Sequence, residues 1–363
     1  MPVVALLLMY TLFQGKTIGG ANASRWIQIP FIGIGFQTST LASMVLMIYV
    51  ARYLAKKREI EDSFKKSVIE LWLPVFFILM LILPANFSTA ALIFAMVSML
   101  VFVGKYPLKY LATIIGAGII FLTFFILVAK AFPDAFPHRV DTWISRIENF
   151  TGDKPDEDNY QIDKAKIAIA TGGFYGLGPG KSVQKNFLPQ SSSDFIYAII
   201  VEENGLIGAV VIMFLYIMLF IRFLIASHKA NTLFGKLLVV GLGFPIVFQA
   251  LINMAVAVEL LPVTGQTLPL ISSGGSSIWM TCVSLGIILS VTKKDEEIAQ
   301  EILEKAKREE ALQRLIEREM NGELEDEEEK NEEEESEYTN EKVEQRYAIE
   351  DLSDNPMKAV MGK

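Results

Sequence analysis

Long apolar runs alternate with short polar connections over most of the chain. A helix needs about 20 residues to cross a hydrocarbon core of about 30 Å, so these runs are candidate membrane spans. They are residues 1–13, 32–54, 71–83, 88–103, 111–132, 195–225, 238–258 and 277–291. The run 1–13 is too short to span alone, and it lacks the basic start and cleavage site of a signal peptide. The pattern predicts an all-α polytopic membrane protein with about eight transmembrane helices.

The polar connections predict the orientation of these helices. "ARYLAKKREIEDSFKK", "KYPLK" and "RFLIASHKANTLFGK" are short and rich in Lys and Arg, and they alternate with connections that are longer or less basic. Short basic loops stay in the cytoplasm. Both termini are therefore predicted to be cytoplasmic, and a long loop of about residues 133–193 is predicted to lie on the outer face.

Composition supports a membrane protein and sets the C-terminal part apart. Apolar residues make up 52% of the chain. The net charge of −8 is local, because residues 293–363 carry 12 Lys and Arg against 25 Asp and Glu. We predict a transmembrane domain over 1–292, an amphipathic cytoplasmic helix over 293–320 and an acidic disordered tail over 321–363. A solvated tail is favoured over a specific docking motif.

The sequence excludes several kinds of soluble enzyme site. It contains no P-loop, no GxSxG motif and no dinucleotide-binding fingerprint. Cys282 is the single cysteine, and His138 and His228 lie far apart in the sequence. A disulfide framework and a His/Cys zinc site are therefore not expected.

The second half of the outer segment combines apolar, aromatic and cationic residues. Lys164 shares a short helical pattern with Ile162 and Ile167, which suits a helix at the lipid surface. "GGFYGLGPG" then breaks the helix, because its glycines permit backbone conformations that other residues resist. The alternatives are a flexible loop with scattered charges and a surface that holds a lipid-linked anion.

Three carboxylates follow this loop. "NFLPQSSSDFIYAIIVEENGLIG" places Asp194 at the start of an apolar run that also contains Glu202 and Glu203. Acids within membrane segments are functional candidates, although they often pair with neighbouring helices. We give structural support and a role in catalysis or substrate binding equal weight for the two glutamates.

A second irregular stretch, "LPVTGQTLPLISSGGSSIWM", lies before the last span. Its prolines and glycines cannot all sit in an unbroken helix. Irregular backbone at membrane depth survives only when it is buried in protein or lines a watery cavity, so a cavity is predicted. Its backbone is assigned to Pro262, Thr264, Gly265, Pro269, Ser272, Gly274, Gly275 and Ser276. We expect Gly274 and Gly275 to allow close backbone approach.

These two stretches closely resemble the signature regions of the SEDS family (shape, elongation, division and sporulation). "ANASRWI" is similar to the family's Arg-Trp loop, and "LPANFSTA" is similar to its Pro-Asp-x-Gly-Thr turn. The resemblance covers residues 1–292 and is FtsW/RodA-like, with the FtsW branch favoured by the long charged tail. The family has ten spans with both ends in the cytoplasm, so the first two spans are expected to be missing here.

Some positions depart from the family pattern. Asn86 stands where the family usually has Asp, and Thr40 and Ser43 replace ionisable residues. Gln190 and Ser192 stand where an acid and a histidine are common, whereas Asp194 is retained. Because these five residues differ from the family pattern, the resemblance assigns no role to their positions.

The resemblance implies a peptidoglycan glycosyltransferase that polymerises lipid II at the outer face of the cytoplasmic membrane during cell division. The acceptor's C4 hydroxyl attacks C1 of the donor sugar with inversion, and the lipid pyrophosphate leaves. A sugar hydroxyl needs a general base, and Asp194 is the candidate. The pyrophosphate needs cations, and a divalent ion, Mg²⁺ or Mn²⁺, is a candidate assistant. The substrate-binding candidates are Arg25, Trp26, Arg139, Arg146, Lys164, Lys181, Lys185, Glu202 and Glu203.

Two other functions stay open. A lipid II flippase would also use polar groups and a cavity, and a non-catalytic divisome scaffold would use the acidic tail. The resemblance further implies a class B penicillin-binding transpeptidase as a partner, contacts with other divisome proteins and membrane lipid, and a position in the bacterial inner membrane, at the division site. Nucleic acid is not an expected partner.

Overall fold

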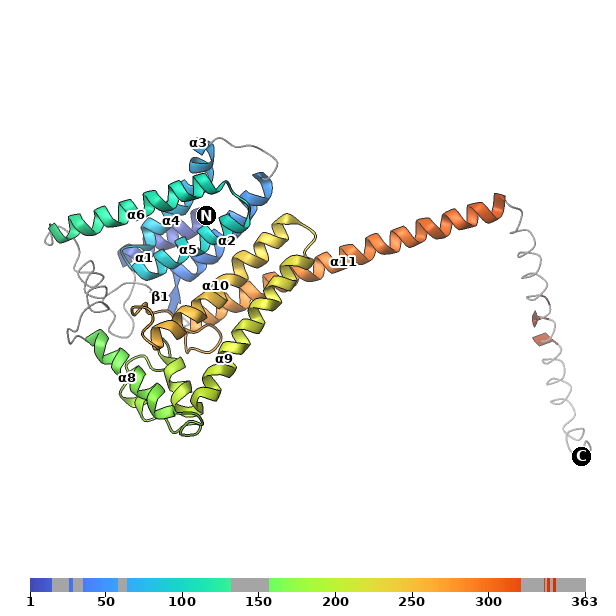
Figure 1. The fold of residues 1–363 in the computed structure, drawn as a ribbon. Coiled ribbons are helices and arrows are strands. Elements are labelled where there is room, and N and C mark those ends of the chain that lie inside the picture. The colour runs from blue at the N-terminus through green and yellow to red at the C-terminus, as the bar shows by residue number, and fades with distance from the viewer. Residues whose placement is uncertain are drawn as a thin grey trace, which may run out of the picture. The chain divides into compact units, whose positions relative to one another are not determined.

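The computed structural model of the chain describes residues 1–14, 26–28, 35–57, 64–131, 157–320, 336, 338–339 and 342–343. The chain divides into two compact units, Met1–Asp295 and Glu296–Lys363. The first unit holds the helices of the predicted membrane domain (Figure 1). The second unit contains the end of the last helix and the described part of the acidic tail.

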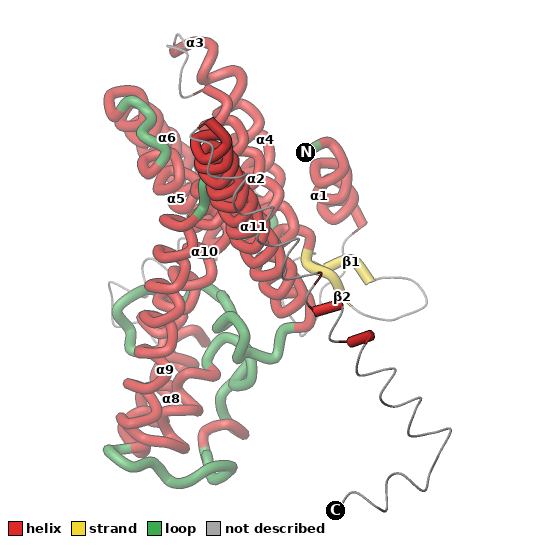
Figure 2. Tube along the Cα trace, turned by 90° about the vertical axis from the view of Figure 1, so that its right-hand side faces the viewer, coloured by secondary structure: helices red, strands yellow, loops and turns green. Residues whose placement is uncertain are grey.

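Nearly all of the described structure is helical (Figure 2). The elements are α1 Pro2–Gln14, β1 Trp26–Gln28, β2 Gly35–Gln37, α2 Thr38–Lys57, α3 Phe64–Ser67, a π-helix Val68–Trp72, α4 Leu73–Ile82, α5 Phe87–Val103, α6 Leu108–Ala131, α8 Glu157–Gly172, a 3₁₀-helix Gln184–Asn186, α9 Ile196–Lys229, α10 Leu233–Ala257 and α11 Gly275–Met320. Each of the eight predicted apolar stretches coincides with one of these helices.

Four of the described helices are long and apolar enough to cross a membrane, namely 38–57, 196–229, 233–257 and 275–293. Shorter apolar helices cover 2–13, 87–103 and 108–124. The predicted third stretch, 71–83, is part of a longer helical segment, because α3, the π-helix and α4 follow each other without a break from Phe64 to Ile82. The all-α polytopic fold class is thus confirmed.

Two boundaries differ from the sequence prediction. Residues 35–37 belong to an antiparallel hairpin in which Trp26 pairs with Gln37 and Gln28 with Gly35, so α2 begins at Thr38 and not at residue 32. At the other end, α11 begins at Gly275 and ends at Met320, so the span 277–291 and the helix 293–320 are assigned to one helix. Within the second unit, the apolar side chains of Ile302 and Leu312 are exposed.

The core of the first unit forms around α10. Of the four long helices it is the most enclosed, because 72% of the residues in its apolar 18-residue stretch are buried. Two glycines permit this packing, since a Cβ at Gly241 would lie 2.9 Å from the Leu100 side chain of α5 and one at Gly243 would lie 2.7 Å from the Phe223 ring of α9. Small residues let helix backbones approach closely, so α10 sits between α2, α5 and α9 (Figure 1).

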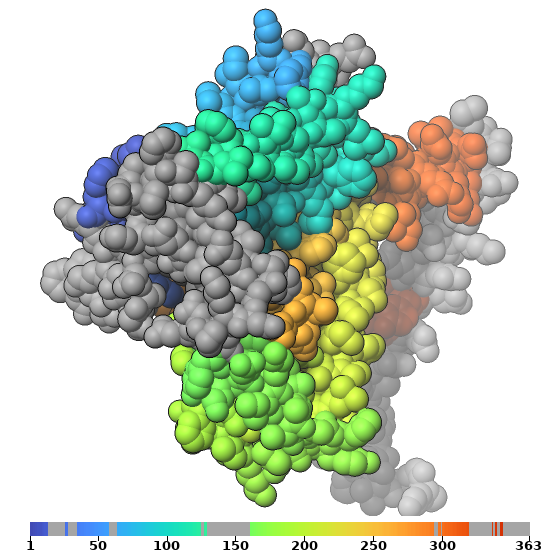
Figure 3. Space-filling model, turned by 60° about the vertical axis from the view of Figure 1, so that its left-hand side comes forward, coloured from blue at the N-terminus to red at the C-terminus, as the bar shows by residue number. Residues whose placement is uncertain are grey.

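A lobe at one end of the first unit consists of α8, the loop after it and the start of α9 (Figure 3). Its shape depends on a break in α9 at Gly205, which has φ 67° and ψ −165°. Only glycine adopts this region readily. The predicted span 195–225 corresponds to α9, but the apolar run did not reveal the break, because hydrophobicity does not report one glycine-specific backbone conformation.

The loop after α8 attaches to this break through its main chain. The N–H groups of Leu177 and Gly178 donate to the carbonyls of Glu202 and Glu203, each at 2.9 Å, and the Leu206 N–H donates to the Gly173 carbonyl at 2.9 Å. There is no room for side chains here, because a Cβ at Gly176 would lie 2.1 Å from the Glu203 carbonyl oxygen. The glycines of "GGFYGLGPG" therefore serve a close backbone approach.

We predict that Gly205→Ala destabilises the protein. The added Cβ would lie 2.3 Å from the Phe174 carbonyl oxygen and would force alanine into a strained conformation, a cost on the order of 1–3 kcal/mol. The thermal unfolding midpoint in detergent should fall by several degrees. Gly116→Ala in α6 is the control, because its Cβ would meet no heavy atom of the described residues within 4 Å. Equal midpoints for the two variants would contradict this account of the break.

Candidate functional site

Asp194 lies in the turn that leads into α9. The N–H groups of Ser193 and Asp194 donate to the Gln190 carbonyl at 3.0 and 3.1 Å, and Gln190 has a left-handed φ of 55°. Phe195, the N-cap residue of α9, is 1% exposed and packs in a cluster with Ile162 of α8. The buried ring holds the turn in place, and Asp194 itself is only partly buried.

The stretch 261–280 meets this turn. Gly265 has a left-handed φ of 64°, and a Cβ at this position would lie 3.5 Å from Asp194 Oδ2. Asn253 of α10 lies beside both segments, because its Nδ2 donates to the carbonyls of Asp194 and Gln266, each at 2.7 Å. The structure therefore brings Asp194 together with part of the predicted cavity backbone.

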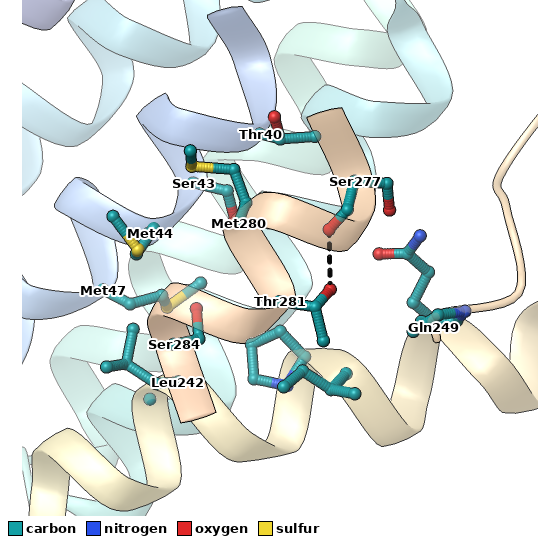
Figure 4. A pocket seen from close by; sticks show the side chains of 14 residues that line it. Thr40, Ser43, Met44, Met47, Leu242, Gln249, Ser277, Met280, Thr281 and Ser284 are labelled. Atoms are coloured by element: carbon teal, nitrogen blue, oxygen red, sulfur yellow. Dashed lines mark hydrogen bonds between the residues drawn. The ribbon is translucent and has the colours of Figure 1, made fainter. Parts of the chain in front are cut away.

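A pocket of about 80 Å³ lies between α2, α10 and the start of α11 (Figure 4). Its polar lining comes from three helices: Thr40 and Ser43 of α2, Gln249 of α10, and Ser277, Thr281 and Ser284 of α11. Pro269 is the member of the predicted cavity backbone that lines it. A pocket therefore lies beside one residue of the irregular stretch, and Thr40 and Ser43, which depart from the family pattern, line it.

The other predicted cavity residues have different surroundings. Pro262 and Thr264 are partly buried, and Ser272 and Ser276 are buried. The expectation of close backbone approach at Gly274 and Gly275 is wrong. Among the described residues, a Cβ at Gly274 would make only ordinary contacts at 3.6 Å and beyond, and one at Gly275 would meet nothing within 4 Å. Close approach occurs instead at Gly172, Gly176 and Gly205.

Glu202 is 1% exposed and holds the loop that precedes Asp194. Its carboxylate accepts a short hydrogen bond from the Ser182 hydroxyl, and it accepts the N–H groups of Val183 and Gln184 at 3.2–3.3 Å. The Glu203 carboxylate accepts a longer bond, 3.4 Å, from the Ser182 N–H. These contacts favour a structural role for Glu202.

The three candidate lysines that the structure describes lie in α8 and in the loop after it. Lys164 Nζ lies 5.4 Å from the centre of the Tyr160 ring and 5.7 Å from that of Phe187, which suits a cation held over aromatic faces. Lys181 and Lys185 are exposed. Trp26 lies in β1, whereas Arg25, Arg139 and Arg146 fall outside the described residues.

An ion pair ties α8 to the segment after α10. Lys166 Nζ lies 2.7 Å from Glu259 Oε2 and 3.3 Å from Asp163 Oδ1. The hydrogen bond to Glu259 raises the pKa of Lys166, against a lowering by burial. The pair therefore contributes at neutral pH, and the stability that comes from the raised Lys166 pKa is lost as the pH rises through that pKa. Because this ammonium is already paired, Lys166 is a weaker candidate for a phosphate ligand than Lys164.

The described residues do not fit a preformed metal site, since among them no three His, Cys, Asp or Glu side chains lie close enough to share an ion. Mg²⁺ commonly binds through one or two carboxylates and substrate phosphates. A divalent cation that accompanies the pyrophosphate therefore stays a prediction.

Sequence reasoning missed several polar residues that hold the site together. Asn253 and Gln249 interrupt the apolar run of α10, and Gln249 Nε2 donates to the Thr267 carbonyl at 2.9 Å. Gln266 Nε2 donates to Thr89 Oγ1 at 2.9 Å, next to the Asn86 cap of α5. Uncharged amides within apolar spans commonly hydrogen-bond between helices, and this signal was available from the sequence.

We predict that Glu202→Gln is more harmful than Glu203→Gln. The amide would turn an NH₂ group toward N–H donors, and an unsatisfied buried group costs about 1–3 kcal/mol. The Glu202 variant should unfold at a lower temperature in detergent and be cleaved faster by protease within 181–187. Glu203→Gln is the matched control. Equal effects would contradict the assignment of this loop to Glu202.

Comparisons with known proteins agree with this architecture. The family model for FtsW, RodA and SpoVE, described as "Cell cycle protein", matches residues 1–297. A protein of Francisella salina named "Probable peptidoglycan glycosyltransferase FtsW" is 32% identical, and the match covers 79% of this chain and 70% of the relative. A relative of the same name from Alcanivorax borkumensis is 34% identical, with 79% and 72% covered.

Solved structures show the same fold. A chain from "Structural coordination of polymerization and crosslinking by a peptidoglycan synthase complex" matches with a TM-score of 0.61 and 25% identity, covering 81% of this chain and 80% of that one. The rod shape determining protein RodA of Thermus thermophilus matches with a TM-score of 0.55 and 24% identity, covering 81% and 76%. The chain therefore belongs to the SEDS family, the FtsW, RodA and SpoVE group of cell cycle proteins.

Proposed function

We propose that this chain is a peptidoglycan glycosyltransferase of the FtsW type, which polymerises lipid II into β-1,4-linked glycan strands. Its relatives carry this activity in their names. The observation that carries the mechanism is Asp194, a partly buried carboxylate in a fixed turn beside Gly265. A positioned carboxylate of this kind suits general base catalysis on a sugar hydroxyl.

Asp194 takes the proton of the acceptor's C4 hydroxyl as this oxygen attacks C1 of the donor. The new bond joins O4 to C1, the bond from C1 to the pyrophosphate oxygen breaks, and the lipid pyrophosphate leaves with its electron pair. Lys164, Lys181 and Lys185 are the described cations that would balance its charge, together with Arg25, Arg139 and Arg146. Because the turn fixes the position of the Asp194 carboxylate, less entropy is lost when this base is brought to the acceptor hydroxyl.

The chain is a multi-pass protein of the bacterial inner membrane. The short basic loops favour cytoplasmic termini, and in this orientation Asp194 and the lobe around α8 face outward, where lipid II presents its sugars. The description of the matching family as a cell cycle protein supports a position at the division site.

A flippase is the second candidate, because a pocket with polar lining between α2, α10 and α11 is also what a transport path needs. A scaffold that acts through the acidic tail is the third. Purified protein in detergent and in vesicles, incubated with fluorescent lipid II, separates them. We expect glycan ladders. Translocation without ladders would favour the flippase, and neither product would favour the scaffold.

We predict that Asp194→Asn inserts, binds lipid II and fails to polymerise it. The amide keeps the shape of the side chain but cannot accept the proton, and loss of a general base costs about 10²–10⁴-fold in rate. Asp163→Asn is the control, because this exposed carboxylate belongs to the same lobe and its ion-pair partner Lys166 is also exposed. Polymerisation by Asp194→Asn at a near wild-type rate, without contaminating glycosyltransferase, would overturn the assignment.

We also predict a class B penicillin-binding transpeptidase as a stable partner. One structural neighbour belongs to a complex that joins polymerisation with crosslinking. The chain, purified from native membranes in mild detergent, should retain a protein that fluorescent penicillin labels. An unrelated polytopic protein from the same membranes is the control. Preparations that never contain such a protein would contradict the prediction.

A further inference from the structure

Three consecutive carbonyls of the Asp194 turn are held by groups from elsewhere in the bundle. The Ser192 carbonyl accepts the Ser273 N–H at 2.8 Å, and the Ser193 carbonyl accepts the Ser272 hydroxyl at 2.5 Å. The Asp194 carbonyl accepts Asn253 Nδ2 at 2.7 Å. The donors come from α10 and from the turn before α11, whereas the acceptors precede α9. The backbone that carries the carboxylate is therefore fixed from two directions.

Asn253 has the most demanding position of these donors. Its side chain is 1% exposed, and its Nδ2 also donates to the Gln266 carbonyl at 2.7 Å, one residue from Gly265. Both partners are acceptors, so they require the NH₂ end of the amide at this place. The Oδ1 atom is buried without a hydrogen-bond partner in the described part of the chain. A buried acceptor without a partner lowers the stability of the fold. The two hydrogen bonds of the NH₂ group offset this cost by holding the Asp194 and Gln266 carbonyls.

We propose that Asn253 is a positioning residue for the polymerisation step, acting through Asp194. One NH₂ group fixes the carbonyl of the base and the loop that borders its carboxylate, so it sets the distance between Asp194 and Gly265. Ser272 supports the same turn one residue earlier, since its hydroxyl donates to Ser193 and accepts the Leu268 N–H at 2.7 Å. This proposal rests on Asp194 as the general base.

The effect on rate follows from geometry. A misplacement of about 1 Å in a reacting group costs about 10²-fold. Asn253→Ala should therefore lower kcat on fluorescent lipid II by about 10²-fold, with KM changed less than about threefold, because substrate is bound by other groups. Ser272→Ala removes one of three supports and should lower kcat on the order of three- to tenfold.

The experiment is a double-mutant cycle in the full-length protein. Polymerisation rates are measured for Asn253→Ala, for Asp194→Asn and for the double variant, together with thermal midpoints in detergent. If Asn253 acts through Asp194, the double variant is as slow as Asp194→Asn alone. Ser227→Ala is the matched control, because its hydroxyl also joins α9 to α10 by donating to the Lys236 carbonyl at 3.2 Å, at the opposite end of the two helices. It should keep the wild-type rate.

Each outcome decides a different claim. If Asp194→Asn is active, the proposed base fails whatever Asn253 does. If Asp194→Asn is inactive and Asn253→Ala keeps its kcat, the positioning role is overturned. A further rate loss in the double variant, or an effect on KM alone, would also overturn it. If Asn253→Ala does not fold, Ser272→Ala decides, and an unchanged kcat there would count against the proposal.

Discussion

Irregular backbone within an apolar helical bundle is stable only when protein groups or water satisfy its N–H and C=O groups, and this constraint governs how residues 258–274 are held. The Tyr216 hydroxyl donates to the Pro269 carbonyl, and Gln249 donates to the Thr267 carbonyl. Asn253 donates to the Gln266 carbonyl in the same way. The helices α9 and α10 thus supply side chains that replace the hydrogen bonds which a helix would have made within itself. The stretch can approach Asp194 because it is held in this way.

The same requirement gives a physical meaning to positions that depart from the family pattern. Asn86 caps α5 by accepting the Thr89 N–H at 3.2 Å, and Thr89 in turn accepts Gln266. An uncharged amide is sufficient for a cap. Thr40 and Ser43 line the pocket beside Ser277 (Figure 4), so the pocket keeps polar groups although it has lost ionisable ones. A hydrogen-bonded path therefore runs from the start of α5 through Gln266 and Asn253 to Asp194.

The sequence was informative where a signal is local and failed where partners are distant. Apolar runs located each of the four described helices that are long enough to span a membrane, and the signature stretches identified Asp194 as a candidate. That Asp194 lies beside the irregular segment came from the fold. The break at Gly205 was missed because hydrophobic periodicity does not report a single dihedral angle. The role of Glu202 was left open because its partner Ser182 lies 20 residues away, across a loop. Gly275 was misjudged since a glycine in the sequence does not reveal whether its surroundings are crowded. Asn253 needed the fold, because its two acceptors come from separate segments.

The lobe around α8 is attached by main-chain bonds at Gly173, Leu177 and Gly178, so its attachment does not depend on the neighbouring side chains. Phe174 is 70% exposed and Tyr175 is 84% exposed, although the Phe174 carbonyl lies in the close backbone approach to Gly205. Their chemical identity can change during evolution without loosening the lobe, provided that the glycines stay. Related chains can therefore vary this surface to suit different surroundings while the geometry around the carboxylate is inherited unchanged.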